Sequence, residues 1–474
     1  MSRSLRRLIA FALGSVTVMA AGPILTGVQA GASDGNNNER LGALAGINHL
    51  VVIYQENRSF DNLYGQFEDA NGIEDQTATQ VNLAGQPYTG CLPQPTPPFT
   101  TACLANQLFD ITQYIPADKK TPDIVHKFYE EQVAIDGGKM DKYVAVSNAK
   151  AASDGRALSI SYYPTSQVAV AKEAANYVLA DNFFHAAFGG SFLNHQWLIC
   201  ACTPIYKNAV KDGGPNDLHT VLGAYGMPQN YGQLTTLAEG NYAINTIQPS
   251  SAPYGGGPKL PLLDNANIGD KLSEKGVSWN WYSGGWDATV AGPTPAPNFQ
   301  YHHQAFNYYA KYAPGTTGRT HLQDETKFFA AAQAGTLPAV SFVKPLGANN
   351  EHPGYADLVT GQQHVLDLIN AVRNGPNWKD TAIVITYDEN GGLWDHVAPP
   401  TSPKHSDMWG PGTRVPTIII SPLAKRHFVD HTVYDTTSIL TTIEHRWNLA
   451  PLGSRDATAN DLRRAFKLGE AGDQ

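Results

Sequence analysis

The sequence predicts an α/β fold built on a mostly parallel central sheet, with functional residues where its strands end. Two stretches far apart in the chain support this prediction. Residues 50–54 (LVVIY) and 381–387 (TAIVITY) are apolar, β-branched runs of the length typical of strands buried on both faces. Each run ends abruptly in polar residues, QEN after the first and DEN after the second. Ligands bind at that edge of an open α/β sheet, so both strands are expected to lead into a site.

The polar residues at these two strand ends predict a metal site. Glu56 and Asn57 follow the first strand, and Asp388 and Glu389 follow the second. Their oxygens are hard ligands of the kind that divalent cations bind. Acidic groups gathered at one place repel each other unless a cation lies between them. For the first cluster alone, the simpler alternative is a solvated turn that Asn57 caps.

A Gly-Gly-Ser turn in the middle of the chain predicts an anion site. Residues 178–184 (VLADNFF) are expected to form a strand and residues 192–202 an apolar helix, with Ser191 at the helix N-cap. Unpaired backbone N–H groups and the helix dipole attract an anion there. The structural alternative is that serine is simply a favoured N-cap residue. With a metal at the same sheet edge, Ser191 is better interpreted as a nucleophile that attacks phosphate.

Several other polar residues are candidates for the same site. In chain order they are His126, Asn194, His195, His302 or His303, His352, Asp395 and His396. Asn194 and His195 follow the serine by one helical turn, where they can donate to phosphate oxygens, although His195 can equally be solvated. His352 follows an expected strand, residues 340–343. Asp395 and His396 have three alternatives, namely binding a second metal, orienting Asp388, or pairing with each other.

The stretches QENRSFDNLYG and YDENGGLWDHVAPP together resemble the bacterial phosphoesterase family that contains phospholipases C and the acid phosphatases similar to acid phosphatase A. The resemblance continues, in a compatible order, through PDIVHKFYEEQVAIDGGKMDKY, FGGSFLNHQW, HHQAFNYY, EHPGY and GTRVPTIIISP. It covers nearly everything after about residue 46. It implies the fold of the alkaline-phosphatase superfamily, a mostly parallel sheet flanked by helices in one large domain with loop insertions.

The resemblance also assigns roles to individual residues. Ser191 stands where family members place a Ser or Thr nucleophile, and a histidine before a GKMD segment, here His126, reaches the site. One histidine of the pair His302 and His303 is implied as well, and we favour His303. The further Asp and His ligands of the two-zinc alkaline phosphatases have no matching positions here, so we expect one divalent ion of open identity.

The combined expectation is a secreted, broad-specificity acid phosphatase that hydrolyses small phosphate monoesters through a phosphoserine intermediate. Ser191 would attack phosphorus, and His126 or His352 would protonate the departing alcohol. The main alternative is phospholipase C, a phosphodiesterase of the same fold, with phospholipid as substrate. Within the resemblance, Ser191 is similar to the serine of the phosphatase branch, whereas the phospholipase branch typically has Thr, and the chain ends soon after the catalytic domain. Both features favour the phosphatase. A non-catalytic phosphate- or metal-binding protein is a third possibility.

The two ends of the chain differ in character. Residues 1–30 carry Arg3, Arg6 and Arg7, then an apolar segment and a VQA sequence, which is typical of a signal peptide and predicts a periplasmic or secreted protein. A membrane anchor is the alternative. Residues 31–45 are expected to form a flexible leader, and residues 46–474 the catalytic domain.

Charge and cysteine content restrict the partners. Without residues 1–30 the chain has 30 basic residues against 42 acidic ones, a net charge of −12, and no basic block. This balance argues against sequence-independent nucleic-acid binding and against electrostatic docking on anionic lipid, and no protein partner can be inferred. Four cysteines in an exported chain predict disulfides. We favour Cys91–Cys103, with Cys200 and Cys202 either joined in a tight loop or left as buried thiols.

Overall fold

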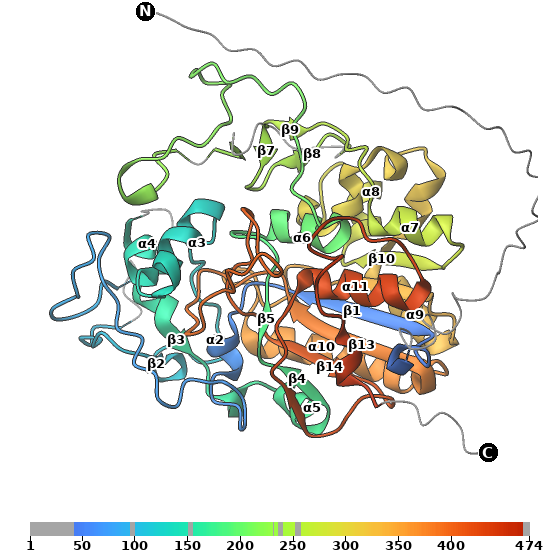
Figure 1. Ribbon diagram of the computed structural model, residues 1–474, viewed down its shortest axis with the longest axis horizontal. Coiled ribbons are helices and arrows are strands. Elements are labelled where there is room, and N and C mark those ends of the chain that lie inside the picture. Colours follow the sequence, from blue (N-terminus) through green and yellow to red (C-terminus); the bar gives the residue numbers. More distant parts are fainter. Residues whose placement is uncertain are drawn as a thin grey trace, which may run out of the picture. The chain divides into compact units, whose positions relative to one another are not determined.

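An eight-stranded sheet lies at the centre of the unit Leu41–Gln474 (Figure 1). The structure, a computed structural model, describes residues 42–94, 100–149, 155–230, 232–235, 240–251 and 257–467. The strand order is β11-β10-β12-β1-β13-β14-β4-β15. The strands are β1 (His49–Gln55), β4 (Val178–Ala180), β10 (Trp279–Ser283), β11 (Leu322–Asp324), β12 (Val340–Lys344), β13 (Thr381–Tyr387), β14 (Thr417–Ile420) and β15 (Phe428–Asp430). Every pairing in this sheet is parallel except the two that β14 makes, with β13 and β4.

The two strands singled out in the sequence are neighbours in the middle of this sheet. β1 and β13 pair in parallel over their whole length, from His49 opposite Thr381 to Gln55 opposite Tyr387. All seven residues of β13 are buried, and only the first residue of β1 is not. Because the paired strands end side by side, the polar residues that follow them emerge at one edge of the sheet.

Helices cover both faces of the sheet. They are α2 (Phe60–Tyr64), α3 (Phe128–Ile135), α4 (Tyr143–Ala149), α5 (Ala171–Asn176), α6 (Ser191–Cys200), α7 (Ile268–Glu274), α8 (Trp286–Ala291), α9 (Glu325–Ala334), α10 (Leu358–Arg373) and α11 (Thr436–Trp447). Helix α6 packs against α7 and α11, and α9 packs against α10. In Figure 1, α6 and α11 lie together on one side of β1 and β13. The predicted α/β class, with a mostly parallel sheet flanked by helices, is confirmed.

Local sequence explains where the longest helices begin. Asp357 caps α10 by accepting a hydrogen bond from the Thr360 N–H at 2.8 Å. The buried residues of α10 recur every three or four positions, which turns one apolar stripe towards the core. Asp435 and Ser438 form a reciprocal capping box at the start of α11. These caps satisfy N–H groups that have no partner within the helix.

Four short two-stranded sheets decorate the unit. They pair β5 (Phe183–Phe184) with β16 (Tyr434–Asp435), β2 (Phe109–Asp110) with β3 (Ser161–Tyr162), β6 (Leu234–Thr235) with β7 (Tyr242–Ala243), and β8 (Gln248–Pro249) with β9 (Lys259–Leu260). The last two pairs lie in the segment between α6 and α7, which also contributes residues to the cavity described below.

The remaining sequence expectations have mixed outcomes. Both disulfides considered there are present, Cys91–Cys103 and the tight Cys200–Cys202 loop. The expected signal peptide and most of the expected leader lie outside the described residues. A short 3-10 turn at Gly42–Leu44 buries Leu44 completely, so the described fold begins slightly ahead of residue 46. Among the helices in the described part of the chain, none has the length and apolarity needed to cross a membrane.

Candidate active site

Ser191 is the first residue of α6 and lies at the edge of the sheet. Gly190, with extended backbone angles, occupies the N-cap, so the N-cap position expected for Ser191 is wrong by one residue. The serine hydroxyl therefore does not cap the helix and instead donates to Glu56 Oε2 at 2.9 Å. Gly189 has φ +88°, and a Cβ there would lie 2.4 Å from the Phe128 nitrogen. Only glycine fits both the conformation and the space at this turn.

Glu56 is a buried carboxylate with a lysine and a histidine as partners. Its Oε1 lies 2.9 Å from His303 Nε2 and forms an ion pair with Lys344. Burial alone would raise the pKa of Glu56, but Lys344 and His303 together hold this pKa well below its ordinary value. Glu56 is thus ionised, and its charge faces the Ser191 hydroxyl.

Lys344 is a site residue that the sequence reasoning missed. It is the last residue of β12 and is fully buried. The signal was available, because a lysine ends the otherwise apolar run VSFVK, and lysine is almost never fully buried unless it is paired. A buried strand that ends in lysine therefore indicates a carboxylate at the same sheet edge.

The four predicted metal ligands lie together beyond β1 and β13. Asp388 Oδ1 accepts hydrogen bonds from the Asn57 N–H at 3.1 Å and the Glu389 N–H at 2.8 Å. Burial raises the pKa of Asp388 well above its ordinary value, and the nearby Glu56 charge raises it further. Burial also raises the pKa of Glu389 well above its ordinary value, and the Asp388 charge raises it further. Three carboxylates are thus buried beyond the ends of β1 and β13 and influence one another electrostatically.

Three buried oxygens of these residues have no hydrogen-bond partner among the described residues, namely Asn57 Oδ1, Asp388 Oδ2 and Glu389 Oε1. Buried polar atoms normally have partners, and oxygen ligands suit a hard divalent ion. The groups of side chains whose ligand atoms lie within 4.8 Å of one another are different ones: Glu56, His195 and His303; Asp123, His126 and His352; and Asp61, Asp395 and His396. A metal held by the four predicted ligands therefore stays a prediction.

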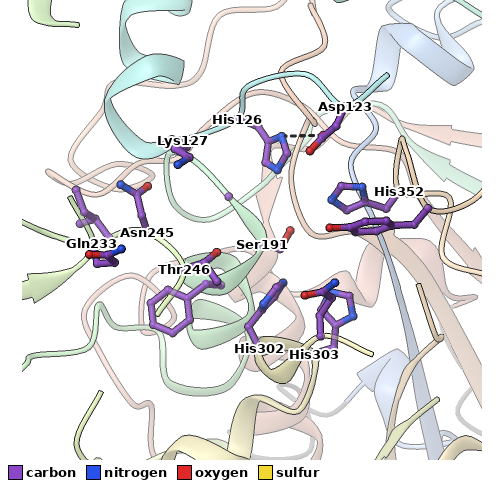
Figure 2. A pocket seen from close by; sticks show the side chains of 15 residues that line it. Asp123, His126, Lys127, Ser191, Gln233, Asn245, Thr246, His302, His303 and His352 are labelled. Atoms are coloured by element: carbon purple, nitrogen blue, oxygen red, sulfur yellow. Dashed lines mark ion pairs between the residues drawn. The ribbon is translucent and has the colours of Figure 1, made fainter. Parts of the chain in front are cut away.

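A cavity of about 230 Å³ opens beside Ser191 and is rich in histidine (Figure 2). Figure 2 shows Ser191 between His126 on one side and His302 and His303 on the other. The residues that line the cavity are Asp123, His126, Lys127, Gly190, Ser191, Phe192, Gln233, Ile244, Asn245, Thr246, Gln300, His302, His303, His352 and Tyr355. The predicted His126, His303 and His352 all reach it, and so does His302.

Hydrogen bonds fix the orientation of two of these rings. His126 Nδ1 donates to the Ile124 carbonyl, which leaves Nε2 to accept from the Asn57 amide at 3.3 Å. His352 Nδ1 donates to the Pro353 carbonyl at 2.6 Å, and burial lowers the pKa of His352. Burial also lowers the pKa of His303, to about 4.

The Asn194 side chain bonds to the protein backbone rather than being left to contact phosphate as predicted. Its Oδ1 accepts from the Ala187 N–H at 3.0 Å, and its Nδ2 donates to the carbonyls of Ala187 and Gly189. The side chain therefore holds the turn that precedes α6, and its hydrogen-bonding capacity is used there. The neighbouring His195 is fully buried, and its Nδ1 donates to the Ser191 carbonyl at 2.7 Å.

Asp395 and His396 lie outside the cavity lining, contrary to their predicted substrate-binding role. Arg414 Nε donates to Asp395 Oδ1 at 2.8 Å, and Arg414 Nη2 donates to Asp61 Oδ1 at 2.9 Å. His396 Nδ1 donates to the other oxygen of Asp61, also at 2.8 Å. The guanidinium supplies positive charge to both acids. Ligand atoms of Asp61, Asp395 and His396 also lie within 4.8 Å of one another.

Glu351, in the loop that carries His352, makes the stability of the folded protein depend on pH. Its buried carboxyl accepts from Gln362 Nε2 at 2.9 Å and from the Tyr387 hydroxyl at 3.0 Å, with Arg58 and Tyr64 nearby. Burial outweighs the Arg58 charge and raises the pKa of Glu351 to about 7. Between its ordinary pKa and 7 the native state binds more protons than the unfolded state, so stability falls as pH rises through this window.

We expect Glu351→Gln to remove this dependence. The free energy of unfolding of the wild type, measured relative to the variant, should fall by roughly 3 kcal/mol between pH 4.5 and pH 8. Urea unfolding of both proteins across that range is the measurement. The other titrating groups are common to both proteins and cancel in the comparison. A difference that stays constant with pH would show that Glu351 is ionised throughout.

Comparisons with known proteins place the chain among phosphoesterases. The model of the Phosphoesterase family matches residues 47–450. The non-hemolytic phospholipase C of Pseudomonas aeruginosa is 25% identical, over 98% of this chain and 64% of that protein, so this chain spans less than two thirds of it. Phospholipase C A of Mycobacterium tuberculosis is also 25% identical, over 90% of this chain and 78% of the relative.

Solved structures resemble the chain only distantly. A protein in the alkaline phosphatase superfamily from Vibrio parahaemolyticus has a TM-score of 0.32 and 11% identity over 74% of each chain. A phosphonate monoester hydrolase from Silicibacter pomeroyi has a TM-score of 0.34 and 10% identity, over 66% of this chain and 74% of that one. Scores this low carry no weight here, whereas the family match covers most of the sequence. This protein therefore belongs to the Phosphoesterase family.

Proposed function

We propose that this protein is a metal-dependent phosphomonoesterase of the acid phosphatase type, with Ser191 as its nucleophile. The observation that carries the proposal is the Ser191 hydroxyl at the start of α6, bonded to the buried Glu56 carboxylate. The helix N-terminus attracts a phosphoryl group, so substrate phosphorus would lie next to this hydroxyl. A divalent ion bound by Glu56, Asn57, Asp388 and Glu389 would supply positive charge that lowers the proton affinity of the hydroxyl and balances the phosphoryl oxygens.

The residues then divide the reaction between them. The Ser191 oxygen forms a bond to phosphorus as the bond to the leaving oxygen breaks, which gives a phosphoserine that water hydrolyses. An imidazole, His126 or His352, gives a proton to the departing alcohol. Because the pKa of His352 is lowered by burial, its ring is protonated only on the acidic side of its ordinary range. That shift supports an enzyme that works best at acidic pH.

The cavity favours a small substrate with several free phosphate oxygens. Lys127, Asn245, His302 and His303 surround a volume of about 230 Å³. The non-bridging oxygens of a monoester can all accept from such donors, whereas a diester replaces one of them with a second alkoxy group. A site built to hydrogen-bond a group discriminates strongly against substrates that lack it.

We therefore expect kcat/KM for p-nitrophenyl phosphate to exceed that for bis(p-nitrophenyl) phosphate by at least about tenfold, roughly 1.4 kcal/mol in transition-state binding. Both chromogenic esters are assayed at the same pH and metal concentration, with phosphatidylcholine micelles alongside. Phosphatidylcholine hydrolysis faster than monoester hydrolysis would identify a phospholipase C, the second candidate, which the names of the relatives favour. Absence of turnover with every ester would leave a non-catalytic phosphate- or metal-binding protein.

We also propose that the protein is exported to the periplasm or secreted. Residues 1–30 have the charge and apolarity pattern of a signal peptide. The two disulfides support the same conclusion, because disulfides persist in oxidising compartments. N-terminal sequencing of the protein recovered from the periplasm and from the medium tests this proposal. An intact N-terminus on cytoplasmic protein would contradict it.

A further inference from the structure

We propose that Glu131 is a positioning residue that fixes the Gly189–Gly190–Ser191 turn against the segment that carries His126. The inference rests on the proposed phosphoesterase reaction, in which Ser191 attacks and a histidine gives the proton. Glu131 lies in α3, five positions after His126, and its side chain is 2% exposed. It does not line the cavity, so it would act on the reaction only through the groups it holds.

Both oxygens of Glu131 are fully used, and they point to different segments. Oε2 accepts the Gly189 N–H at 2.6 Å, two residues before Ser191. Oε1 accepts three donors, His185 Nε2 at 2.8 Å, the Thr413 N–H at 3.0 Å and the Thr413 hydroxyl at 3.2 Å. One carboxylate thus joins α3, the turn before α6 and the loop before β14.

Close packing, together with these hydrogen bonds, fixes the distance between the turn at Gly189 and Gly190 and the backbone of the segment that carries His126. A Cβ on Gly189 would lie 2.4 Å from the Phe128 nitrogen, and one on Gly190 would lie 3.0 Å from the His126 carbonyl oxygen. The nucleophile turn therefore rests directly on the backbone of the His126 segment. Since bonds and contacts act on the same few residues, a shift of Gly189 moves Ser191 relative to His126.

His185 is a buried partner of this carboxylate. Its Nδ1 lies 2.9 Å from the Ala187 carbonyl oxygen and its Nε2 lies 2.8 Å from Glu131 Oε1. The ring thus connects Glu131 to the segment that leads into the turn before Ser191, which gives Glu131 a second contact with that segment.

Glu131→Gln tests the inference because glutamine keeps only one acceptor oxygen. The Oε1 position faces three donors, so the amide oxygen takes that position and the NH2 group faces the Gly189 N–H, which loses its partner. We expect kcat for p-nitrophenyl phosphate to fall at least about tenfold, since misplacement by about 1 Å is costly. KM should change less than about threefold, because the phosphate-binding groups are intact. Amide hydrogen exchange at Gly189 should become faster.

Two control variants separate positioning from general destabilisation. Thr413→Val removes the hydroxyl bond to Glu131 but leaves the Gly189 bond in place. Glu325→Gln breaks a comparable pair far along the chain, in which His364 Nε2 lies 2.9 Å from Glu325. Both should lower Tm while kcat stays within about twofold of the wild type. If Glu131→Gln loses no more kcat than Thr413→Val at an equal loss of Tm, the inference is overturned.

The exchange measurement also distinguishes this inference from the proposed function. A wild type that hydrolyses no phosphate ester overturns the proposed function. In that case the Gly189 amide exchange rate alone tests whether Glu131 anchors the turn through its hydrogen bond to the Gly189 N–H. Faster exchange in Glu131→Gln than in Thr413→Val supports anchoring of the turn. Equal exchange rates in the two variants overturn it.

Discussion

Ser191→Ala should lower kcat for p-nitrophenyl phosphate by at least about 10³-fold, as is seen when catalytic nucleophiles are removed. The loss has a simple reason, because the Ser191 oxygen is the atom that would bond to phosphorus. The fold should survive, since Gly190 rather than Ser191 caps α6 and the hydroxyl makes its bond to the Glu56 side chain. Steady-state kinetics and mass spectrometry of acid-quenched samples are the measurements. The wild type should carry a phosphoryl group at Ser191, and the variant none.

Ser438→Ala is the matched control for this experiment. The Ser438 hydroxyl also stands in the first turn of a helix, where it accepts a hydrogen bond from the Asp435 N–H at 3.1 Å. Its loss should cost about 1 kcal/mol of stability and leave kcat unchanged. If Ser191→Ala retains a tenth or more of the wild-type activity, Ser191 is not the nucleophile.

Asp388→Asn should abolish stoichiometric metal binding. Asparagine keeps an oxygen that accepts from the Asn57 and Glu389 N–H groups, so the backbone at the ends of β1 and β13 stays in place. The variant removes one negative charge from the proposed site, where charge would hold the ion. Elemental analysis after dialysis should give less than about a tenth of the wild-type metal content, in keeping with the loss of one ligand. Activity should fall in parallel.

The metal-free proteins provide a second measurement that does not depend on activity. Burial raises the pKa of Asp388, so in the absence of a cation its ionised form destabilises the native state as pH rises above the ordinary pKa of aspartate. Metal-free Asp388→Asn should therefore be at least as stable as metal-free wild type at neutral pH. Asp395→Asn is the control, because it weakens the Arg414 cluster and should leave metal content unchanged. A full metal complement in Asp388→Asn would refute the proposed ligand set.

The sheet and its site edge could be predicted because strong local signals coincided. Two fully apolar strands, each followed at once by carboxylates, have few other arrangements than adjacent places in one buried parallel sheet. The turn at Ser191 was predicted for a similar reason, since Gly-Gly-Ser before an apolar run marks a turn into a helix. In both cases the residues that determine the geometry are neighbours in sequence.

The errors arose where contacts between distant segments decide what a side chain does. Asn194 has the right spacing to face a phosphate, but the Gly189 and Ala187 carbonyls of the preceding turn take its amide. Asp395 and His396 follow β13 like the predicted metal ligands, yet Arg414, in the loop before β14, donates a hydrogen bond to Asp395. Nothing in the local sequence shows where a guanidinium nineteen positions away will point.

The pairing of β1 with β13 would also determine when the proposed ion can be acquired. Asn57 and Asp388 are 331 positions apart in the chain, yet they meet through one hydrogen bond. A partly synthesised chain has Glu56 and Asn57 but lacks Asp388 and Glu389, so the proposed ligand set would be incomplete until most of the protein has been made. An ion that bound only the completed sheet would stabilise the native state by mass action. The compartment in which β13 joins β1 would then decide which divalent ions compete for the proposed site.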